Sequence, residues 1–354
     1  MRIATLQFAP RLGKVERNIE RANELLKSGR VIERESDDGG SAKVRTGVEG
    51  LGVEVLVLSE MALTGYNFPS LEAIRPYLEP AGEGVSAKWA RETAQRLKCK
   101  VCVGYPEIEK TQSEKEEEEE KCYNSLLMVD EQGEVIVNYR KSFLYYTDET
   151  WAAEGNVERG YHELSMKDDK KVATSFGICM DINPYKFEAP FTAWEFANRI
   201  LDSKSQLVIV SMAWLTTMDR EELDDLAGKP DMDTFNYWIQ RLVPLIRQRM
   251  KHGGDGDGPG SEKKIVIVFA NRSGEEEGAD GKPPVRYAGT STIIAVTQRP
   301  LGSVNKDVVD EDEDVPFDVK ILCWDLKGAT EEGICFADTT ADPEMVFRLA
   351  KASG

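Results

Sequence analysis

The chain has 354 residues, 41% of them apolar, which is enough to bury a substantial hydrophobic core. Its formal net charge of -18 argues against nucleic acids and anionic membrane surfaces as partners. The sequence contains no run of about 18 uncharged apolar residues, so we expect no transmembrane helix.

The predicted elements alternate between strands and helices along the chain. We expect strands at 2–10, 53–60, 100–105, 124–130, 134–141, 171–178, 206–214, 264–271 and 291–296. We expect helices at 15–29, 86–98, 189–203 and 233–250, the last interrupted or restarted at Pro244. Residues 30–52 are charged and rich in glycine, which favours a surface insertion.

This alternation predicts an α/β fold in which the central strands of a sheet are buried. No stretch reads as a linker between independent units. We therefore expect one domain over residues 1–300 and a C-terminal extension over 301–354 that packs on the same domain.

The acidic runs and the CxxC pair do not by themselves indicate a function. Residues 114–121 and 310–314 contribute -4 and -5 to the net charge, and such acidic blocks are mostly solvated loops. Cys99 and Cys102 form one CxxC pair without a second pair, which is weak evidence for zinc, and a strand explains them better. The opening MRIATLQFAP lacks the apolar region of a signal peptide, and six scattered cysteines fit a reducing compartment. We expect a cytoplasmic protein, with the nucleus and the mitochondrion left open.

Three reactive side chains stand where predicted buried strands end. Glu60 ends VEVLVLSE, Lys141 ends EVIVNYRK, and Cys179 follows KVATSFGI. A lone cysteine after a strand is usually structural, but three chemically complementary groups at three strand ends are expected to meet at one edge. His162 and His252, the two histidines, lie in polar segments, so the base for a reactive Cys179 would be a carboxylate or a lysine.

These residues resemble the Glu–Lys–Cys triad of the nitrilase superfamily of carbon–nitrogen hydrolases. The resemblance rests on LVLSEMALTGY, NYRKSFLY and FGICMDINPYKF, and it runs in the family's order from residue 1 to about residue 295. Within that superfamily, YRKSFLYYTDETWAAEGN and CMDINPYKFEAPFTAWEFA resemble the fungal protein N-terminal amidase branch. Phe143 stands where many relatives have histidine, and Ile182-Asn183-Pro184-Tyr185 replaces an Arg-Phe-Pro-Glu run. Both departures lie beside the expected pocket, so they affect specificity and leave the triad intact.

The resemblance implies a four-layer α-β-β-α sandwich and a hydrolase without metal or organic cofactor. Cys179 would be the nucleophile and Glu60 its base. Lys141 and the backbone N–H of Met180 would stabilise the oxyanion, and the lysine would also favour the thiolate.

The resemblance also implies a second carboxylate that orients the lysine. Glu149 is the best match to it, with Asp148 one residue away.

The implied substrates are proteins or peptides that begin with Asn or Gln, which the N-degron pathway deamidates to Asp or Glu with release of ammonia. Such a pocket needs an acid for the α-ammonium group, and Asp181 suits either that role or the capping of a turn. Tyr66 and Trp214 are candidates for the pocket wall or for the core.

Two other functions remain open. One is a small-molecule amidase or nitrilase of the same superfamily. The other is a non-enzymatic acidic interaction protein, which would have no need of the three strand-end groups together. The resemblance also allows a homo-oligomer.

Overall fold

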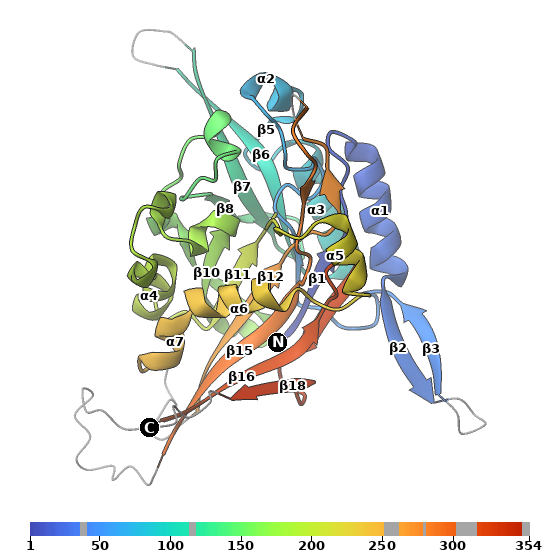
Figure 1. Ribbon diagram of the computed structural model, residues 1–354, viewed down its shortest axis with the longest axis vertical. Helices are drawn as coiled ribbons and strands as arrows, with labels where there is room; N and C mark the ends of the chain where they lie inside the picture. Colours follow the sequence, from blue (N-terminus) through green and yellow to red (C-terminus); the bar gives the residue numbers. More distant parts are fainter. Residues whose placement is uncertain (36–40, 113–117, 251–261, 279–280, 302–316, 349–354) are drawn as a thin grey trace.

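The computed structural model describes residues 1–35, 41–112, 118–250, 262–278, 281–301 and 317–348. Two seven-stranded mixed sheets lie face to face, and helices cover their outer faces (Figure 1). The predicted four-layer α-β-β-α sandwich is therefore confirmed.

The first sheet has the strand order β17-β1-β4-β6-β7-β8, and β5 pairs with β6. β1, β4 and β6 are parallel, whereas β7, β8 and β17 join antiparallel to their neighbours. The strands are β1 (Arg2–Gln7), β4 (Val55–Leu58), β5 (Glu79–Pro80), β6 (Lys100–Gln112), β7 (Glu118–Val129), β8 (Val135–Arg140) and β17 (Gly333–Asp338).

The second sheet has the order β18-β16-β15-β12-β11-β10-β9, with a parallel centre of β10, β11 and β12. Its strands are β9 (Tyr161–Ser165), β10 (Lys171–Ile178), β11 (Leu207–Ser211), β12 (Lys263–Ala270), β15 (Thr292–Pro300), β16 (Phe317–Leu326) and β18 (Met345–Arg348). Two small pairs lie apart from both sheets: β2 (Arg30–Glu35) with β3 (Ser41–Thr46), and β13 (Glu275–Glu276) with β14 (Val285–Arg286).

The helices form the two outer layers. α1 (Val15–Ser28) and α3 (Gly84–Leu97) pack on the first sheet, while α4 (Glu195–Asp202), α6 (Met232–Arg241) and α7 (Val243–Arg247) pack on the second. Among the described helices, none combines the length and the apolar character that crossing a bilayer requires. The shorter helical segments are α2 (Leu71–Ile74), α5 (Arg220–Asp225), η1 (Arg75–Tyr77), η2 (Asp148–Thr150), η3 (Val157–Gly160), η4 (Lys167–Asp169), η5 (Cys179–Ile182), η6 (Tyr185–Phe187) and η7 (Phe191–Ala193).

Alternation along the buried strands explains why they are apolar throughout. On β4, Val55 and Val57 belong to the core between the sheets, whereas Leu56 and Leu58 belong to the core under α1 and α3. Successive side chains of a strand point to opposite faces, so a strand covered on both faces needs apolar side chains at odd and even positions alike. The run 53–60 satisfies this requirement.

The structure departs from the predicted elements in three places. The helix expected at 189–203 begins only at Glu195, because Trp194 adopts a left-handed backbone conformation with φ of 43°. The C-terminal stretch contains strands that the sequence analysis did not predict: β16 lies within the second sheet, and β17 pairs with β1 in the first. The insertion contains the β2–β3 pair.

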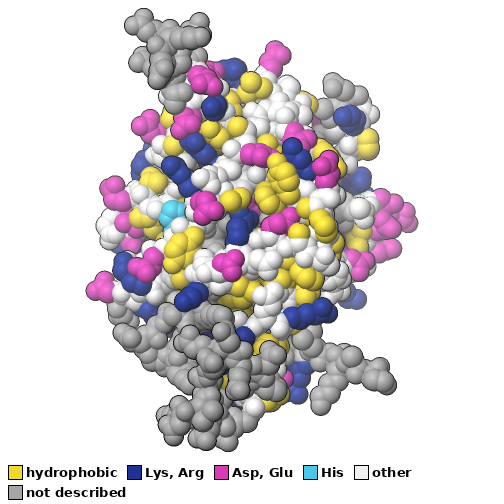
Figure 2. All heavy atoms as spheres, turned by 90° about the vertical axis from the view of Figure 1, so that its left-hand side faces the viewer, with side chains coloured by type: hydrophobic (Ala, Val, Ile, Leu, Met, Phe, Trp, Pro, Cys, Tyr) yellow, Lys and Arg dark blue, Asp and Glu magenta, His cyan; other side chains and the backbone are white. Residues whose placement is uncertain are grey.

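Three sequence features fall partly or wholly outside the described residues. The acidic run 310–314 and His252 lie there, as do residues 114–117 of the other acidic run, whose remainder belongs to β7. On the face shown in Figure 2, acidic and basic side chains are interspersed, with hydrophobic side chains in small patches between them.

Burial predicts the stability cost of truncating these strands. Ile267 on β12 is fully buried, whereas Ile136 on β8 is 36% exposed. Ile267→Ala should lower the free energy of unfolding by about 2–5 kcal/mol, measured by urea titration, because it leaves a cavity. The matched control Ile136→Ala should cost about 1 kcal/mol or less. Equal losses in both variants would contradict the assigned core.

Candidate active site

The three strand-end residues meet where strands of both sheets end. Glu60 follows β4, Lys141 follows β8, and Cys179 follows β10 of the opposite sheet. Glu60 and Lys141 have no solvent exposure, and Cys179 is 8% exposed. The folded chain thus brings Lys141 next to Glu60, which lies 81 residues earlier in the sequence.

Lys141 is paired with two buried carboxylates. Its ammonium nitrogen lies 2.7 Å from Oε1 of Glu60 and 2.6 Å from Oδ2 of Asp148, and none of the three side chains is exposed. Glu149, the residue expected in this place, is exposed instead. Successive residues of a 3₁₀ helix point about 120° apart, so only one of the two acids at the start of η2 can face the lysine. The supporting carboxylate is Asp148.

This arrangement shifts the pKa values of its members. Burial by itself would lower the pKa of Lys141, but the charges of Asp148 and Glu60 outweigh it and the net pKa lies above its usual value. Burial raises the pKa of Glu60, and the lysine opposes this shift in part. The lysine is therefore a permanent cation, while Glu60 is a stronger base than an exposed glutamate.

Two further groups bind the Glu60 carboxylate. The side-chain amide of Asn124 donates to Oε1 of Glu60 at 2.7 Å and to Oδ1 of Asp148 at 2.9 Å. The backbone N–H of Ala213 donates to Oε2 of Glu60 at 2.7 Å. The sequence analysis missed Asn124; its one signal was a polar side chain at the start of the apolar run NSLLMV.

Close packing also fixes the position of Glu60. Gly104 on β6 passes so near that a Cβ there would lie 2.7 Å from the backbone nitrogen of Met61 and 2.8 Å from the Cα of Glu60. Only glycine leaves room for this approach.

Cys179 sits on a strained turn between β10 and the 3₁₀ helix η5. Its φ of 42° is left-handed, a conformation that costs about 1–3 kcal/mol for a residue other than glycine. Burial and the charge of Glu60 raise the pKa of its thiol well above the usual value. Lys141 lowers this pKa, as expected, and so does the N–H of Ala213, but both together do so by less than burial and Glu60 raise it.

Asp181 holds this turn and does not line the pocket. Its buried carboxylate accepts hydrogen bonds from the N–H groups of Ile178, Ser142 and Phe143 at 2.8–3.0 Å. The Tyr139 hydroxyl donates to it at 2.8 Å. Of the two roles that the sequence left open, the structure supports turn capping, which ties the nucleophile turn to the segment after Lys141.

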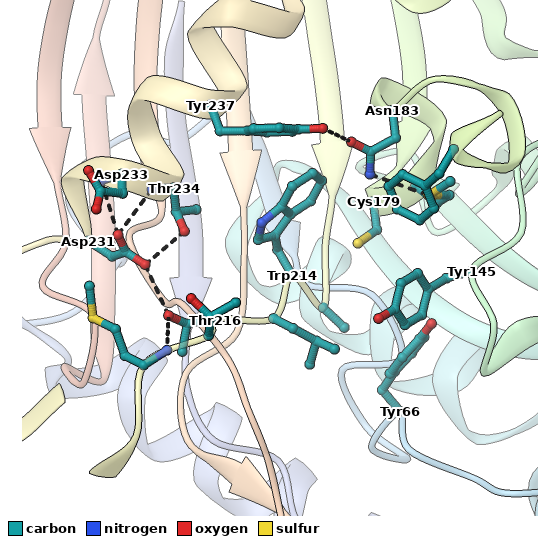
Figure 3. A pocket seen from close by; sticks show the side chains of 16 residues that line it. Tyr66, Tyr145, Cys179, Asn183, Trp214, Thr216, Asp231, Asp233, Thr234 and Tyr237 are labelled. Atoms are coloured by element: carbon teal, nitrogen blue, oxygen red, sulfur yellow. Dashed lines mark hydrogen bonds between the residues drawn. The ribbon is translucent and has the colours of Figure 1, made fainter. Parts of the chain in front are cut away.

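A cavity of about 500 Å³ opens above Cys179. Figure 3 shows Tyr66 and Tyr145 beside the thiol and the Trp214 ring on its other side. Met180 also lines this cavity, as do Asp231 and Asp233 at the start of α6. Tyr66 and Trp214 therefore both line the pocket, and Tyr66 also belongs to a buried hydrophobic cluster.

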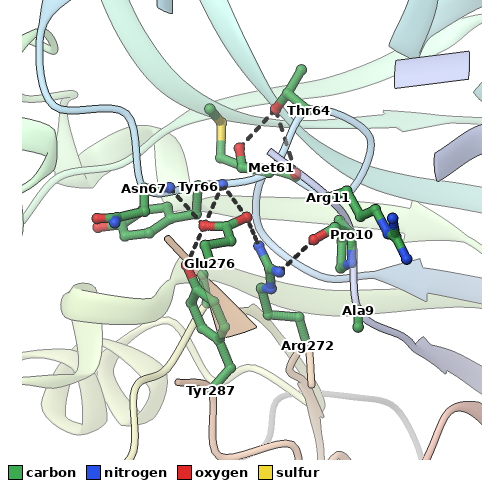
Figure 4. Close-up of polar contacts among 12 residues, drawn as sticks. Ala9, Pro10, Arg11, Met61, Thr64, Tyr66, Asn67, Arg272, Glu276 and Tyr287 are labelled. Atoms are coloured by element: carbon green, nitrogen blue, oxygen red, sulfur yellow. Dashed lines mark hydrogen bonds and ion pairs between the residues drawn. The ribbon is translucent and has the colours of Figure 1, made fainter. Parts of the chain in front are cut away.

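A second buried ion pair supports the loop after Glu60. Glu276 accepts hydrogen bonds from the N–H groups of Tyr66 at 3.1 Å and Asn67 at 2.8 Å, and it pairs with the buried Arg272 (Figure 4). The Tyr287 hydroxyl donates to the same carboxylate at 2.5 Å. Arg272, Glu276 and Tyr287 therefore hold the backbone of Tyr66, a residue that lines the pocket.

The Tyr66 side chain extends this support to the charged centre. Its hydroxyl donates to Oδ2 of Asp148 at 3.2 Å, and its ring lies 5.5 Å from the ammonium of Lys141.

No metal centre is visible in the residues that the structure describes: no group of three His, Cys, Asp or Glu side chains could hold an ion. Cys99 and Cys102 are both buried, with Cys102 in β6 and in the core between the sheets. His162 lies on β9, where its Nε2 contacts the carbonyl oxygen of Arg159 at 3.0 Å.

Comparisons with known proteins agree with this geometry. A protein N-terminal amidase of Schizosaccharomyces pombe is 32% identical over 314 residues, which cover 84% of this chain and 92% of that protein. A protein N-terminal amidase of Saccharomyces cerevisiae is 33% identical over 70% of this chain, but the match spans 64% of its own length.

A crystal structure of an N-terminal amidase with an Asn-Glu-Ala peptide has the same fold, with a TM-score of 0.64 at 22% identity over 99% of both chains. The carbon–nitrogen hydrolase model matches residues 2–183, which include all three strand-end groups. The resemblance inferred from their motifs is confirmed, and the chain belongs to the carbon–nitrogen hydrolase family.

Proposed function

We propose that this enzyme hydrolyses the side-chain amide of Asn or Gln at the N-terminus of a protein or peptide, producing Asp or Glu and ammonia. The observation that carries the proposal is the Cys179 thiol, placed between a buried Glu60–Lys141–Asp148 centre and an open pocket. The two curated relatives named as protein N-terminal amidases support the same substrate class.

The first half of the reaction forms a thioester. Because the resting thiol is neutral, Glu60 takes its proton as the sulfur attacks the amide carbon. The carbonyl oxygen becomes negative and is stabilised by the Lys141 ammonium and the N–H of Met180. Glu60 then returns the proton to the amide nitrogen, the C–N bond breaks, and ammonia leaves.

The second half releases the product. Glu60 takes a proton from a water molecule, whose oxygen attacks the thioester carbon. The C–S bond breaks as Glu60 passes this proton to the sulfur, and the new carboxyl group loses its own proton to solvent, so the side chain leaves as a carboxylate. Asp148 and Asn124 keep the lysine and Glu60 in place through both steps.

Acidic side chains on the pocket wall suit a substrate with a free α-ammonium group. Asp231 caps α6 by accepting from the N–H groups of Asp233 and Thr234, and Asp233 is exposed where the wall meets solvent. Both line the pocket, whereas Asp181 does not. We therefore assign the attraction of the amine to Asp231 and Asp233.

The proposal includes the cellular setting. All six cysteines are free thiols, and the reaction needs Cys179 reduced, so we place the enzyme in the cytoplasm. Residues 1–300 and the strands that follow are proposed to work as one unit, because β16 and β17 complete the two sheets.

The nucleophile is tested by Cys179→Ala. This variant should release no ammonia from an Asn peptide, because no thioester can form. Ammonia release is measured beside Cys323→Ala, a buried cysteine on β16, which should keep its activity. Full activity of Cys179→Ala would refute the covalent route.

Two matched variants test whether Asp148 or Glu149 is the carboxylate that supports Lys141. Asp148→Asn should lower kcat by about 10²–10⁴-fold, because Lys141 loses one of its two partners beside the reacting atoms. Glu149→Gln should remain within about twofold, since Glu149 is exposed. The reverse order of effects would return the role to Glu149.

The substrate class is tested with acetylated peptides. Acetyl-Asn peptides should show kcat/KM about 30-fold or more below the free-amine peptides, because the charge that the acidic wall attracts is lost. Ala-Asn peptides should not react, since their amide is internal. Comparable turnover of acetyl-Asn, Ala-Asn and a free ω-amide would identify a general small-molecule amidase instead.

A further inference from the structure

We propose that Tyr145, Tyr146 and Phe187 form a binding site for the side chain of the second residue of the substrate and favour a large apolar side chain there. We call these three residues the aromatic shelf. The inference rests on the proposed function and extends it from the first residue of the substrate to the next.

The aromatic shelf is one packed cluster. The ring centroids of Tyr145 and Tyr146 lie 5.0 Å apart, and the Phe187 ring lies 6.3 Å from Tyr145 and 6.0 Å from Tyr146. Tyr145 meets Phe187 edge to face at 83°. These spacings are those of aromatic rings in contact, so the three rings present a continuous apolar surface.

The aromatic shelf stays exposed although it is apolar. Tyr146 is 62% exposed and Phe187 is 44% exposed, which places both among the large hydrophobic side chains that the described surface leaves uncovered. An exposed apolar cluster at the edge of a pocket is typical of a binding surface.

Phe187 is exposed on a backbone bend whose conformation is energetically unfavourable. Lys186 and Phe187 both have φ of 54°, and left-handed conformations are unfavourable for bulky residues. Hydrogen bonds from Phe187 N–H to Pro184 O at 2.9 Å and from Glu188 N–H to Tyr185 O at 3.0 Å maintain this bend. Strain of this kind persists where the surroundings enforce it, and here it turns an aromatic ring away from the core.

The aromatic shelf continues directly from the catalytic centre. Tyr145 and Phe187 line the same cavity as Cys179. The N–H of Tyr145 donates to Oδ2 of Asp148 at 3.0 Å. The shelf therefore lies on the nucleophile's side of the pocket.

The reach of a peptide brings its second residue to this position. Consecutive Cα atoms are about 3.8 Å apart, so the side chain of the second residue starts within about 7 Å of the reacting amide carbon. With the first side chain bound at Cys179, the second must lie at the rim of the pocket. Through Tyr145 and Phe187, the aromatic shelf provides apolar surface in the pocket that Cys179 lines, and this surface would lose solvent contact when covered.

The test compares ammonia release from Asn-Leu, Asn-Phe and Asn-Gly peptides of equal length. We expect kcat/KM for the Leu and Phe peptides to exceed that for the Gly peptide by about 5- to 20-fold. This ratio is smaller than the discrimination that an enclosed hydrophobic pocket can reach, because the shelf is partly open to solvent. Tyr146→Ser and Phe187→Gly should each reduce this ratio to about twofold or less. Glycine at 187 adopts the observed φ without strain, so the fold is preserved.

The control is Tyr161→Ser, which removes a tyrosine that is 44% exposed on β9, outside the shelf, and should keep the wild-type ratio. A wild-type ratio below twofold would overturn the proposal, as would an unchanged ratio in Tyr146→Ser. A Tyr146→Ser variant that changes oligomeric mass in sedimentation but not the ratio would instead assign the shelf to contact between copies. Absence of ammonia release from every Asn peptide would refute the proposed function itself, and the shelf with it.

Discussion

The Lys141 ammonium lies between the carboxylates of Glu60 and Asp148, and all three are closed off from solvent. Removing one member of such a buried group costs about 3–5 kcal/mol, because the remaining charge stays unpaired. The surrounding elements are therefore held to one arrangement. Asn124 bridges the two carboxylates, and the N–H of Ala213 reaches Glu60 from the opposite sheet.

This centre depends on the contact between the two sheets. Glu60 and Lys141 follow strands of the first sheet, while Cys179 and Ala213 follow β10 and β11 of the second. The Ser211 hydroxyl on β11 donates to the carbonyl of Leu58 on β4 at 2.9 Å, which joins the sheets beside the site. Because sheets packed through their side chains slide little, the thiol and its base keep their separation.

The site combines a rigid charged interior with a strained, open rim. Cys179 and Phe187 both have positive φ, and both face the same cavity. Asp181 holds the first turn, and hydrogen bonds after Pro184 hold the second. The charged centre is the same for any amide, whereas the rim decides which chain can bring its amide to the sulfur. We thus assign the chemistry to the charged centre and the choice of substrate to the rim of the pocket.

A neutral resting thiol fits this division. Beside the buried Glu60, a thiolate would add a second negative charge, so burial and repulsion raise the pKa of Cys179. The proton therefore moves only as the sulfur attacks and the lysine begins to stabilise the new oxyanion. The enzyme then holds no exposed thiolate between turnovers, which limits oxidation of the nucleophile.

Much of this molecule followed from local patterns. The apolar runs predicted the central strands, and the positions at which they end identified Glu60, Lys141 and Cys179. The motif around each residue indicated the family and the four-layer fold. Tyr66 and Trp214 also line the pocket, and they lie in the segments that follow β4 and β11.

Other features depended on the folded chain. A repeat of two or 3.6 residues indicates which face of an element is buried, but not which of two adjacent acids turns toward a lysine, so Asp148 and Glu149 were not distinguished. Asn124 and Glu276 act on residues 64 and 210 positions away, and no local pattern marks such partners. The exposure of Phe187 likewise comes from the backbone bend after Pro184. Local sequence limits each residue's environment, whereas hydrogen-bond partners depend on the direction of individual side chains and on contacts between distant segments.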